Sequence, residues 1–190
     1  VPVTVLGTPV VIVADTEAPV FDSIPADITV QCSAVPGPGA PVATDACDTA
    51  VELTYEGQTT TPGNCVGNYT ITRTWRATDD CDNTTTAAQV ITVRDTQPPT
   101  FTEPADITIS LDGDCEYDAP TTLTGQISNA ADNCSPVDSL RAVFTDTFSE
   151  GPGSGGTITR NWIVIDDCGN SSSGQIQLIT VVDNTPPTIT

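Results

Sequence analysis

The chain has 190 residues, of which 25 are acidic and 5 are basic, so its formal net charge is −20. A surface this acidic repels phosphate backbones, which argues against nucleic-acid binding. The sequence has no histidine, which excludes a Ser-His-Asp triad and any metal centre built on imidazole. No apolar run approaches the roughly 18 residues of a membrane-spanning helix, so we expect no membrane insertion.

An internal repeat organises the chain. The segment that begins at Asp15 returns at Asp95, and a third copy begins at Asp183. Three further motifs recur in register: Pro-Ala-Asp-Ile-Thr at 25–29 and 104–108, Ile-Thr-Arg-x-Trp at 71–75 and 158–162, and Asp-Asp-Cys-x-Asn at 79–83 and 166–170. The repeat predicts two domains, 15–95 and 96–183, followed by a linker and the start of a next domain at 184–190.

Residues 1–14 precede the first full repeat. In the repeat alignment, Pro9–Ala14 match the last strand of a domain whose earlier strands are absent. Residues 1–14 are therefore predicted to be the last strand of a preceding domain of the same kind as the two repeats. The alternative is a donor strand that completes the sheet of a neighbouring subunit.

Both repeats have the pattern of all-β domains. Runs rich in Thr, Val and Ile are bounded by Gly, Pro, Asp and Asn, and helical periodicity is missing. About seven short strands per repeat predict tandem immunoglobulin-like β-sandwiches, arranged end to end. The clearest strands are expected at 26–32, 51–60, 69–78 and 86–94, and at 105–111, 140–147, 156–165 and 175–182.

Seven cysteines in so short a chain indicate an oxidising compartment and structural disulfides. No lysine or histidine lies beside them to lower a thiol pKa, so a nucleophilic cysteine has no support. The chain also lacks the CxxC-like pairs of a cysteine zinc site. Its many carboxylates instead favour a hard cation with oxygen ligands, namely calcium (Ca²⁺).

Each repeat resembles the hyalin-repeat (HYR-like) family of immunoglobulin-like modules. The resemblance rests on Asp-Thr-x-x-Pro at 15–19 and 95–99, on Pro-Ala-Asp-Ile-Thr, and on the paired loops around 44–47 and 77–81 with their counterparts at 131–134 and 165–170. The four-cysteine form is similar to repeats of very large bacterial surface adhesins exported by the type IX route. This resemblance implies an extracellular structural or adhesive role, on the cell surface or in a secreted filament.

Four cysteines allow three connectivities, and the sequence does not choose among them. The immunoglobulin-like topology and the repeat alignment favour Cys47–Cys81 at one pole of the first repeat and Cys32–Cys65 at the other. In the second repeat they favour Cys134–Cys168. Cys115 is then unpaired, because a Gly-rich segment replaces the counterpart of Cys65, and it is either a free thiol or a bridge to another chain or domain.

Carboxylates gather on the linker and on the two loops that carry the paired motifs. Converging oxygens of this kind are the ligands that calcium takes, although some of these side chains are expected to cap tight turns instead. The candidate ligands are Asp15, Asp45, Asp48, Asp79, Asp80 and Asp82 in the first repeat, and Asp95, Asp132, Asp166, Asp167 and Asn170 in the second.

Two further sets of residues are singled out. Arg73 and Arg160 recur on one strand, where a structural salt bridge or stacking on a neighbouring tryptophan is expected, and a carboxylate-ligand pocket is the alternative. The bacterial resemblance implies O-linked sugars at Asp-Ser/Thr-aliphatic sites, at Ser23, Thr49 and Ser139.

The leading functional hypothesis is a non-enzymatic module whose tandem domains form a calcium-rigidified, disulfide-clamped rod, stalk or filament. Its expected partners are neighbouring repeats of the same protein and other copies in a filament. The alternatives are a carbohydrate-binding module and a filament subunit that assembles by donor-strand exchange. Paired catalytic carboxylates across a cleft are not recognisable, so no enzymatic activity is expected.

Overall fold

The computed structural model describes residues 14–111, 117–150, 155–184 and 186. The segment predicted to be a last strand or a donor strand lies almost entirely outside these residues, and so does Cys115. The described part of the chain contains no helix that is long and apolar enough to cross a membrane.

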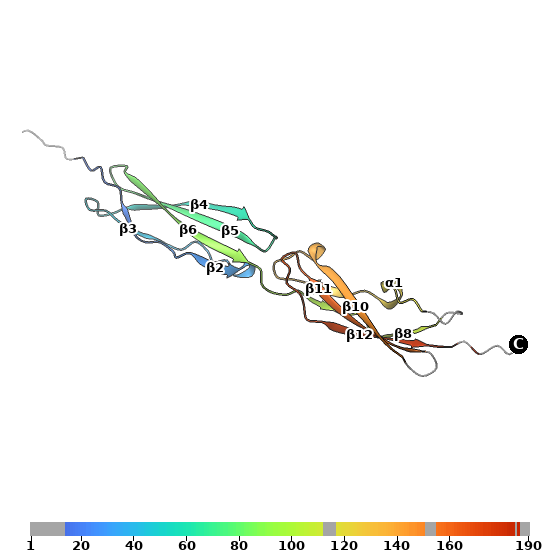
Figure 1. Ribbon diagram of the computed structural model, residues 1–190. Coiled ribbons are helices and arrows are strands. Elements are labelled where there is room, and N and C mark those ends of the chain that lie inside the picture. The colour runs from blue at the N-terminus through green and yellow to red at the C-terminus, as the bar shows by residue number, and fades with distance from the viewer. Residues whose placement is uncertain (1–13, 112–116, 151–154, 185, 187–190) are drawn as a thin grey trace, which may run out of the picture. The chain divides into compact units, whose positions relative to one another are not determined.

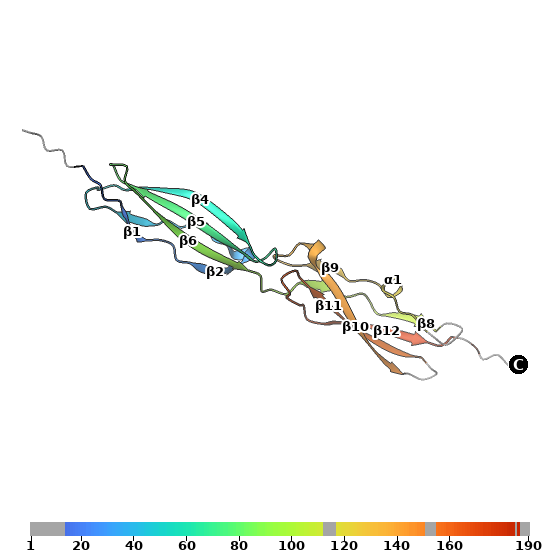
Figure 2. The same ribbon diagram turned by 45° about the horizontal axis from the view of Figure 1, so that its top comes forward.

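The first repeat folds into two sheets. Strands β1 (Val20–Ser23) and β3 (Val42–Thr44) pair antiparallel, and a short 3-10 turn, η1 (Cys32–Ala34), follows β2. The larger sheet has the order β2-β6-β5-β4, from β2 (Ile28–Gln31), β6 (Thr84–Arg94), β5 (Tyr69–Thr78) and β4 (Glu52–Pro62). Figures 1 and 2 both show β4, β5 and β6 side by side.

The second repeat repeats this plan. Strand β7 (Thr100–Thr102) pairs with β9 (Ser128–Ala131), and the larger sheet has the order β10-β11-β12-β8. Its strands are β8 (Ile107–Ser110), β10 (Arg141–Glu150), β11 (Gly156–Ile165) and β12 (Gln175–Val182), with β8 and β12 parallel and the other pairs antiparallel. One short helix, α1 (Thr121–Thr124), and one 3-10 turn, η2 (Val137–Ser139), complete it. The all-β immunoglobulin-like prediction is thus confirmed, with six named strands among the described residues of each repeat.

The central strands carry the core. Every second side chain of β11 is buried, namely Ile158, Arg160, Trp162 and Val164. Strand β5 has the same alternation and buries Ile71, Arg73, Trp75 and Ala77. Successive side chains of a strand point to opposite faces. Both arginines therefore lie on the buried face of their sheet, in line with the tryptophans.

The recurrent Pro-Ala-Asp-Ile-Thr motif has a structural reason. Asp27 Oδ1 accepts the backbone N–H of Val90 at 2.7 Å, and Asp106 Oδ1 accepts that of Leu178 at 2.7 Å. In both repeats the motif therefore ties the segment before the first strand of the larger sheet to the last strand.

Contacts divide the chain into two compact units. Unit 1 contains the chain up to Ile28 with Pro36–Thr61 and Thr70–Thr92, and unit 2 contains Thr29–Val35, Pro62–Tyr69 and the chain from Val93 onward. Two short segments of the first sequence repeat, residues 29–35 and 62–69, thus belong to unit 2. They carry Cys32 and Cys65.

Candidate functional site

Asp132 begins the loop that follows β9. Its Oδ1 accepts the backbone N–H groups of Cys134 and Ser135, both at 2.8 Å, which closes an Asx turn. Its Oδ2 is buried and has no hydrogen-bond partner among the described residues. One oxygen of Asp132 therefore shapes the loop, and the other remains unsatisfied.

Asp95 directly follows β6 and is 5% exposed. Its Oδ1 accepts the N–H of Gln97 at 3.1 Å, and its own N–H donates to Asn68 Oδ1 at 2.8 Å. Its Oδ2 is also buried and without a partner in the described part of the chain. Asp95 thus has the same arrangement as Asp132, with one oxygen anchored and one free.

These two carboxylates meet within unit 2. One oxygen of Asp95, one of Asp132 and the Sγ of Cys134 lie within 4.8 Å of one another. Burial raises the pKa of Asp95, and the negative charges of Asp132, Asp166 and Asp167 raise it further. Buried anionic oxygens without partners are costly. A hard cation would remove this cost, because Ca²⁺ coordinates carboxylate oxygens at about 2.3–2.6 Å. The sulfur of Cys134 is not counted as a ligand, because it forms a disulfide.

The other predicted ligands of the second repeat are engaged in hydrogen bonds. Asp166 accepts the backbone N–H and the side-chain amide of Asn170, both at 2.8 Å, and that amide also donates to the carbonyl of Asp95 at 3.4 Å. Asp167 accepts the Ser135 hydroxyl and the N–H of Val66, and these bonds lower its pKa. These residues hold the two loops and the 62–69 segment together around Asp95.

The disulfides differ from the expected pairing. The structure joins Cys32 to Cys134 and Cys65 to Cys168, with Cα–Cα distances of 5.9 and 5.2 Å that lie in the normal range for disulfides. This corrects the expected Cys32–Cys65 and Cys134–Cys168 bonds. The expected pairing assumed that each repeat closes on itself, whereas the segments that carry Cys32 and Cys65 pack with the loops of the second repeat in unit 2.

The 62–69 segment covers the Asp95 carboxylate, and Gly67 makes this approach possible. A Cβ added at Gly67 would lie 2.6 Å from the Cβ of Asp95 and 3.0 Å from that of Cys134. The turn around it is closed by N–H to carbonyl bonds from Gly63 to Asn68 at 2.8 Å and from Asn68 to Cys65 at 3.1 Å. The roles of Gly67 and Asn68 were not predicted from the sequence. The Gly and Asn residues between Cys65 and the next strand are the signal that indicates this turn.

Unit 1 contains the counterpart of this cluster. One oxygen of Asp15, one of Asp45 and the Sγ of Cys47 lie within 4.8 Å of one another. Asp15 Oδ1 accepts the N–H of Glu17 at 3.0 Å, and Asp45 Oδ1 accepts those of Cys47 at 2.8 Å and Asp48 at 3.1 Å. Asp15 is half-buried whereas Asp95 is buried.

The remaining predicted ligands of the first repeat lie on the same two loops. Asp79 accepts the backbone N–H and side-chain amide of Asn83 at 2.8 and 2.7 Å; burial opposes ionisation of Asp79, but these bonds outweigh it and lower its pKa. Asp48 Oδ2 accepts the N–H of Asp80 at 2.8 Å and so joins the loops. Asp80 and Asp82 are exposed, and Asp82 adopts a left-handed φ of 66° in the turn.

Cys47 and Cys81 are free and exposed, so the expected Cys47–Cys81 bond is absent from the structure. The charge of Asp15 raises the pKa of the Cys47 thiol, with smaller contributions from burial and from Asp45. The two cysteines thus remain as thiols on the loops that carry the first carboxylate cluster.

The two buried arginines confirm one expectation and modify the other. Arg160 donates to both oxygens of Asp146, at 2.8 and 2.7 Å, and its guanidinium lies 4.1 Å from the ring centroid of Phe144. Arg73 instead donates to neutral acceptors, the Gln58 side chain at 3.2 Å and the carbonyls of Gly37 at 2.9 Å and Pro36 at 2.6 Å.

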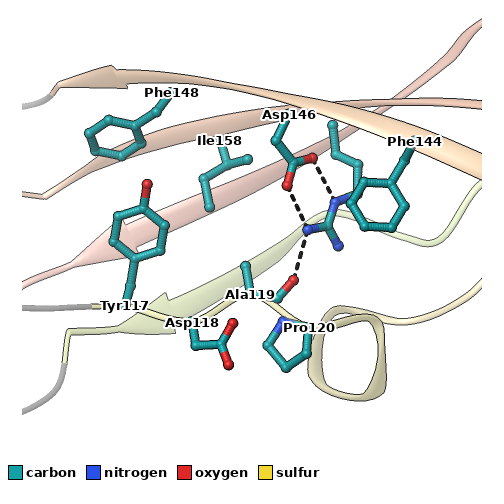
Figure 3. Close-up of a pocket in the computed structure, with 9 residues that line it drawn as sticks. Tyr117, Asp118, Ala119, Pro120, Phe144, Asp146, Phe148 and Ile158 are labelled. Atoms are coloured by element: carbon teal, nitrogen blue, oxygen red, sulfur yellow. Dashed lines mark hydrogen bonds and ion pairs between the residues drawn. The ribbon is translucent and has the colours of Figure 1, made fainter.

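Beside Arg160 lies a pocket, shown in Figure 3. A carboxylate-ligand pocket at this arginine was one alternative drawn from the sequence, but the aromatic lining was not predicted. Its rim carries Tyr117 and Phe148, whose rings stack with centroids 5.3 Å apart, and Phe144. All three rings are about 40% exposed. The recurrence of Phe144 and Phe148 on one face of β10 is the sequence signal for this feature.

The three predicted glycosylation positions lie in different settings. Ser23 ends β1 and is exposed, and Thr49 is exposed in a loop. Ser139 is half-buried, and its hydroxyl donates to the carbonyl of Pro136 at 2.7 Å.

With two immunoglobulin-like β-sandwiches and a repeated pattern of acidic, cysteine-bearing loops, the chain is of the class of tandem β-sandwich repeat proteins. Residues 20–93 match the family model of the HYR-like domain with 4 cysteines. The matched residues contain four cysteines, Cys32, Cys47, Cys65 and Cys81.

Among curated proteins no significant match is found. Among solved structures the chain is similar to protocadherin gamma B7 extracellular cadherin domains 1–4, with 18% identity over 88% of this chain and 51% of that one, and a TM-score of 0.36. It is also similar to human mucin-like protocadherin EC1-2, with 13% identity over 88% and 100% of the two chains and a TM-score of 0.37. Protocadherin gamma B2 domains 3–6 give 14% identity over 89% and 52%, and a TM-score of 0.38. The chain thus spans about half the length of the two gamma protocadherin chains.

Proposed function

We propose that this chain is a non-enzymatic, extracellular structural and adhesive repeat module. In this proposal Ca²⁺ binds at the carboxylate clusters, disulfides hold the loops around them, and successive repeats build a rod, stalk or filament at the cell surface. Its partners are neighbouring repeats or further copies of the same protein. The HYR-like match of residues 20–93 and the in-register repetition of the same motifs support this role.

The pair of buried oxygens in unit 2 is the observation that carries the proposal. Asp95 Oδ2 and Asp132 Oδ2 are both buried without a partner. Each side chain is also fixed through its other oxygen, so the pair is held in place before a cation arrives. Two preorganised carboxylates with the nearby charges of Asp166 and Asp167 are suited to a divalent cation and costly without one.

Calorimetric titration of the oxidised full chain with CaCl₂ tests this proposal. We expect saturable binding, and we expect Asp95→Asn combined with Asp132→Asn to abolish the binding at this cluster. The matched control is Asp118→Asn, which removes one charge at an exposed carboxylate of the same repeat and should leave binding unchanged. Equal binding by the double variant and the control would overturn the calcium assignment. The cluster of Asp15 and Asp45 is tested in the same way with its own pair of Asn variants.

The aromatic pocket favours one alternative function, carbohydrate binding. Its volume of about 480 Å³ lies in the range of small-molecule sites. Stacked, exposed Tyr117 and Phe148 offer a surface for the C–H face of a sugar ring, and Asp118 offers a carboxylate acceptor. Saturation-transfer NMR against a panel of monosaccharides tests this function. Signal transfer that disappears in Tyr117→Ala would support it, and absence of transfer in the unmodified chain would reject it.

A further inference from the structure

The two free thiols of unit 1 occupy positions that are disulfide-bonded in the second repeat. Cys47 aligns with Cys134, and Cys81 aligns with Cys168, each pair being separated by the same number of residues. Cys134 and Cys168 bond to Cys32 and Cys65, whereas Cys47 and Cys81 are free and exposed. The first repeat therefore carries the two loop cysteines, but its described residues contain no segments that supply disulfide partners for them.

The loops that present these cysteines have the same local structure in both repeats. Asp45 caps the N–H of Cys47 at 2.8 Å, and Asp132 caps that of Cys134 at 2.8 Å. On the other loop, Asp79 and Asp166 each accept the backbone N–H of the Asn four residues later at 2.8 Å. Asp82 and Gly169, which directly follow Cys81 and Cys168, both have left-handed φ values, 66° and 92°. The first repeat thus holds its two cysteines on loops built like those that bond in the second.

The two repeats differ in the segments that cover these cysteine-bearing loops. In unit 2, residues 29–35 and 62–69 bring Cys32 and Cys65 to the loops, and the second segment packs Gly67 against Asp95 and Cys134. Among the described residues of unit 1 no such segments cover the corresponding loops. Cys47 is exposed where Cys134 is half-buried, and Asp15 is half-buried where Asp95 is buried.

We propose that Cys47 and Cys81 form a covalent docking site for another HYR-like repeat, which supplies two cysteines at positions corresponding to Cys32 and Cys65. The bonds formed are Cys47 to the counterpart of Cys32 and Cys81 to the counterpart of Cys65. Each bond joins two thiols with release of two protons and two electrons. A disulfide oxidant, such as oxidised glutathione, takes the electrons and is reduced to two thiols.

This proposal does not depend on calcium, because the expected pairing of cysteines is taken from the two disulfides of the structure alone. It assigns two directions to the four cysteines of residues 20–93: Cys32 and Cys65 bond to the repeat that follows, and Cys47 and Cys81 bond to a repeat of the same kind on the other side.

The test uses a longer chain in which a second copy of residues 15–94 is placed directly in front of Asp15. The added copy carries Cys47→Ser and Cys81→Ser, so that the only Cys47 and Cys81 belong to the original repeat. The chain is oxidised in a glutathione buffer, alkylated and digested without reductant, and its linked peptides are identified by mass spectrometry. We expect peptides that link Cys47 to Cys32 and Cys81 to Cys65, with the loss of two alkylatable thiols per chain.

A matched chain carries Cys32→Ser and Cys65→Ser in the added copy, and there both thiols should stay alkylatable. The native Cys32–Cys134 and Cys65–Cys168 peptides of the original repeats, recovered from the same digests, show that the protein is folded. Two outcomes would overturn the proposal when these native peptides are present. One is a Cys47–Cys81 link. The other is full alkylation of Cys47 and Cys81 in the chain whose added copy keeps Cys32 and Cys65.

Discussion

At the scale of single residues, the two carboxylate oxygens of Asp95 have different roles, and so do those of Asp132. In each side chain, Oδ1 accepts a backbone N–H and fixes the local turn, while Oδ2 is left buried without a partner. The sequence predicted both residues as ligands, because acidic side chains on a linker and on a loop recur in the repeat. It could not separate them from Asp166 and Asp167, whose hydrogen bonds depend on contacts with distant residues such as Val66.

Asp95→Asn is expected to have opposite effects with and without calcium. Burial and neighbouring charges raise the pKa of Asp95, so its contribution to stability is largest below the unfolded-chain pKa of about 3.9 and is lost as the pH rises through the folded pKa. At pH 7 in EDTA, the variant should therefore melt a few degrees above the unmodified chain. In calcium at about 100 times Kd it should instead lack a stabilisation of about 2.7 kcal/mol.

Thermal unfolding by circular dichroism, in EDTA and in CaCl₂ at constant ionic strength, measures both effects. Asp118→Asn removes the same charge from an exposed position and should follow the unmodified chain in both buffers. A variant that is destabilised equally in the two buffers would show that Asp95 is a purely structural side chain.

Ser135→Ala should change the acid sensitivity of unit 2. The Ser135 hydroxyl is the main cause of the lowered pKa of Asp167, followed by the N–H of Val66. A carboxylate with a lowered pKa adds stability above the unfolded-chain value of about 3.9, and that stability is lost as the pH falls through the folded pKa. The variant should thus be less stable than the unmodified chain near pH 6, and the difference should shrink toward pH 2. Because Asp167 is exposed, we expect a difference below about 1 kcal/mol in urea unfolding. A pH-independent difference would assign the effect to packing of Ser135 alone.

At the scale of elements, β5 and β11 show that alternating buried and exposed residues can predict the bounds of a strand. The predicted bounds 69–78 and 156–165 agree with the structure, because these strands lie in the middle of their sheets and bury one face throughout. The sequence predicted about seven strands per repeat but did not locate the short strands β1, β3, β7 and β9, because they do not stand in longer apolar-alternating runs. Helix α1 was not predicted either, because Thr121–Thr124 has little helix propensity and contacts elsewhere in the fold set its conformation.

The same two strands carry the buried arginines, and their partners differ in charge. Arg160 pairs with Asp146, so Asp146→Asn leaves a buried guanidinium without its anion and should destabilise unit 2 by about 2–4 kcal/mol. Arg73 bonds to Gln58, so Gln58→Glu should add an ion pair and stabilise unit 1 by up to about 1 kcal/mol.

Urea unfolding of both variants at pH 7 and at moderate salt measures these changes. Glu103→Gln offers a control for Asp146→Asn, since it neutralises a half-buried acid of the same repeat that has no arginine partner among the described contacts. A destabilising Gln58→Glu would mean that desolvation of the new carboxylate exceeds its attraction to Arg73.

At the scale of the whole molecule, the disulfides are the feature that sequence reasoning assigned to the wrong partners. The repeat alignment located Cys32, Cys65, Cys134 and Cys168, but it compares residues within one repeat and contains no information on which segments pack across the repeat border. The contact that decides the pairing is between residues 29–35, residues 62–69 and the loops of the second repeat, all in unit 2.

Removal of the two disulfides should lower the stability of unit 2 far more than removal of the free thiols. Each bond closes a loop of about one hundred residues, for which chain entropy gives up to about 4–5 kcal/mol for the first bond and less for the second. Cys134→Ala with Cys168→Ala should therefore unfold at a clearly lower urea concentration. Cys47→Ala with Cys81→Ala removes equally many cysteines and should behave like the unmodified chain. Equal midpoints for both double variants would show that the bonds add nothing to the equilibrium stability.

The disulfide topology also has a mechanical consequence. Tension applied to the two ends of the oxidised chain travels through the bonds at Cys32–Cys134 or Cys65–Cys168, and the intervening polypeptide between each pair of cysteines is bypassed. The covalent path between the ends then contains only about half of the 190 residues. Even a fully unravelled chain would thus extend to about half its contour length, at roughly 3.3–3.6 Å per residue, until a reductant cuts the bonds and releases the rest.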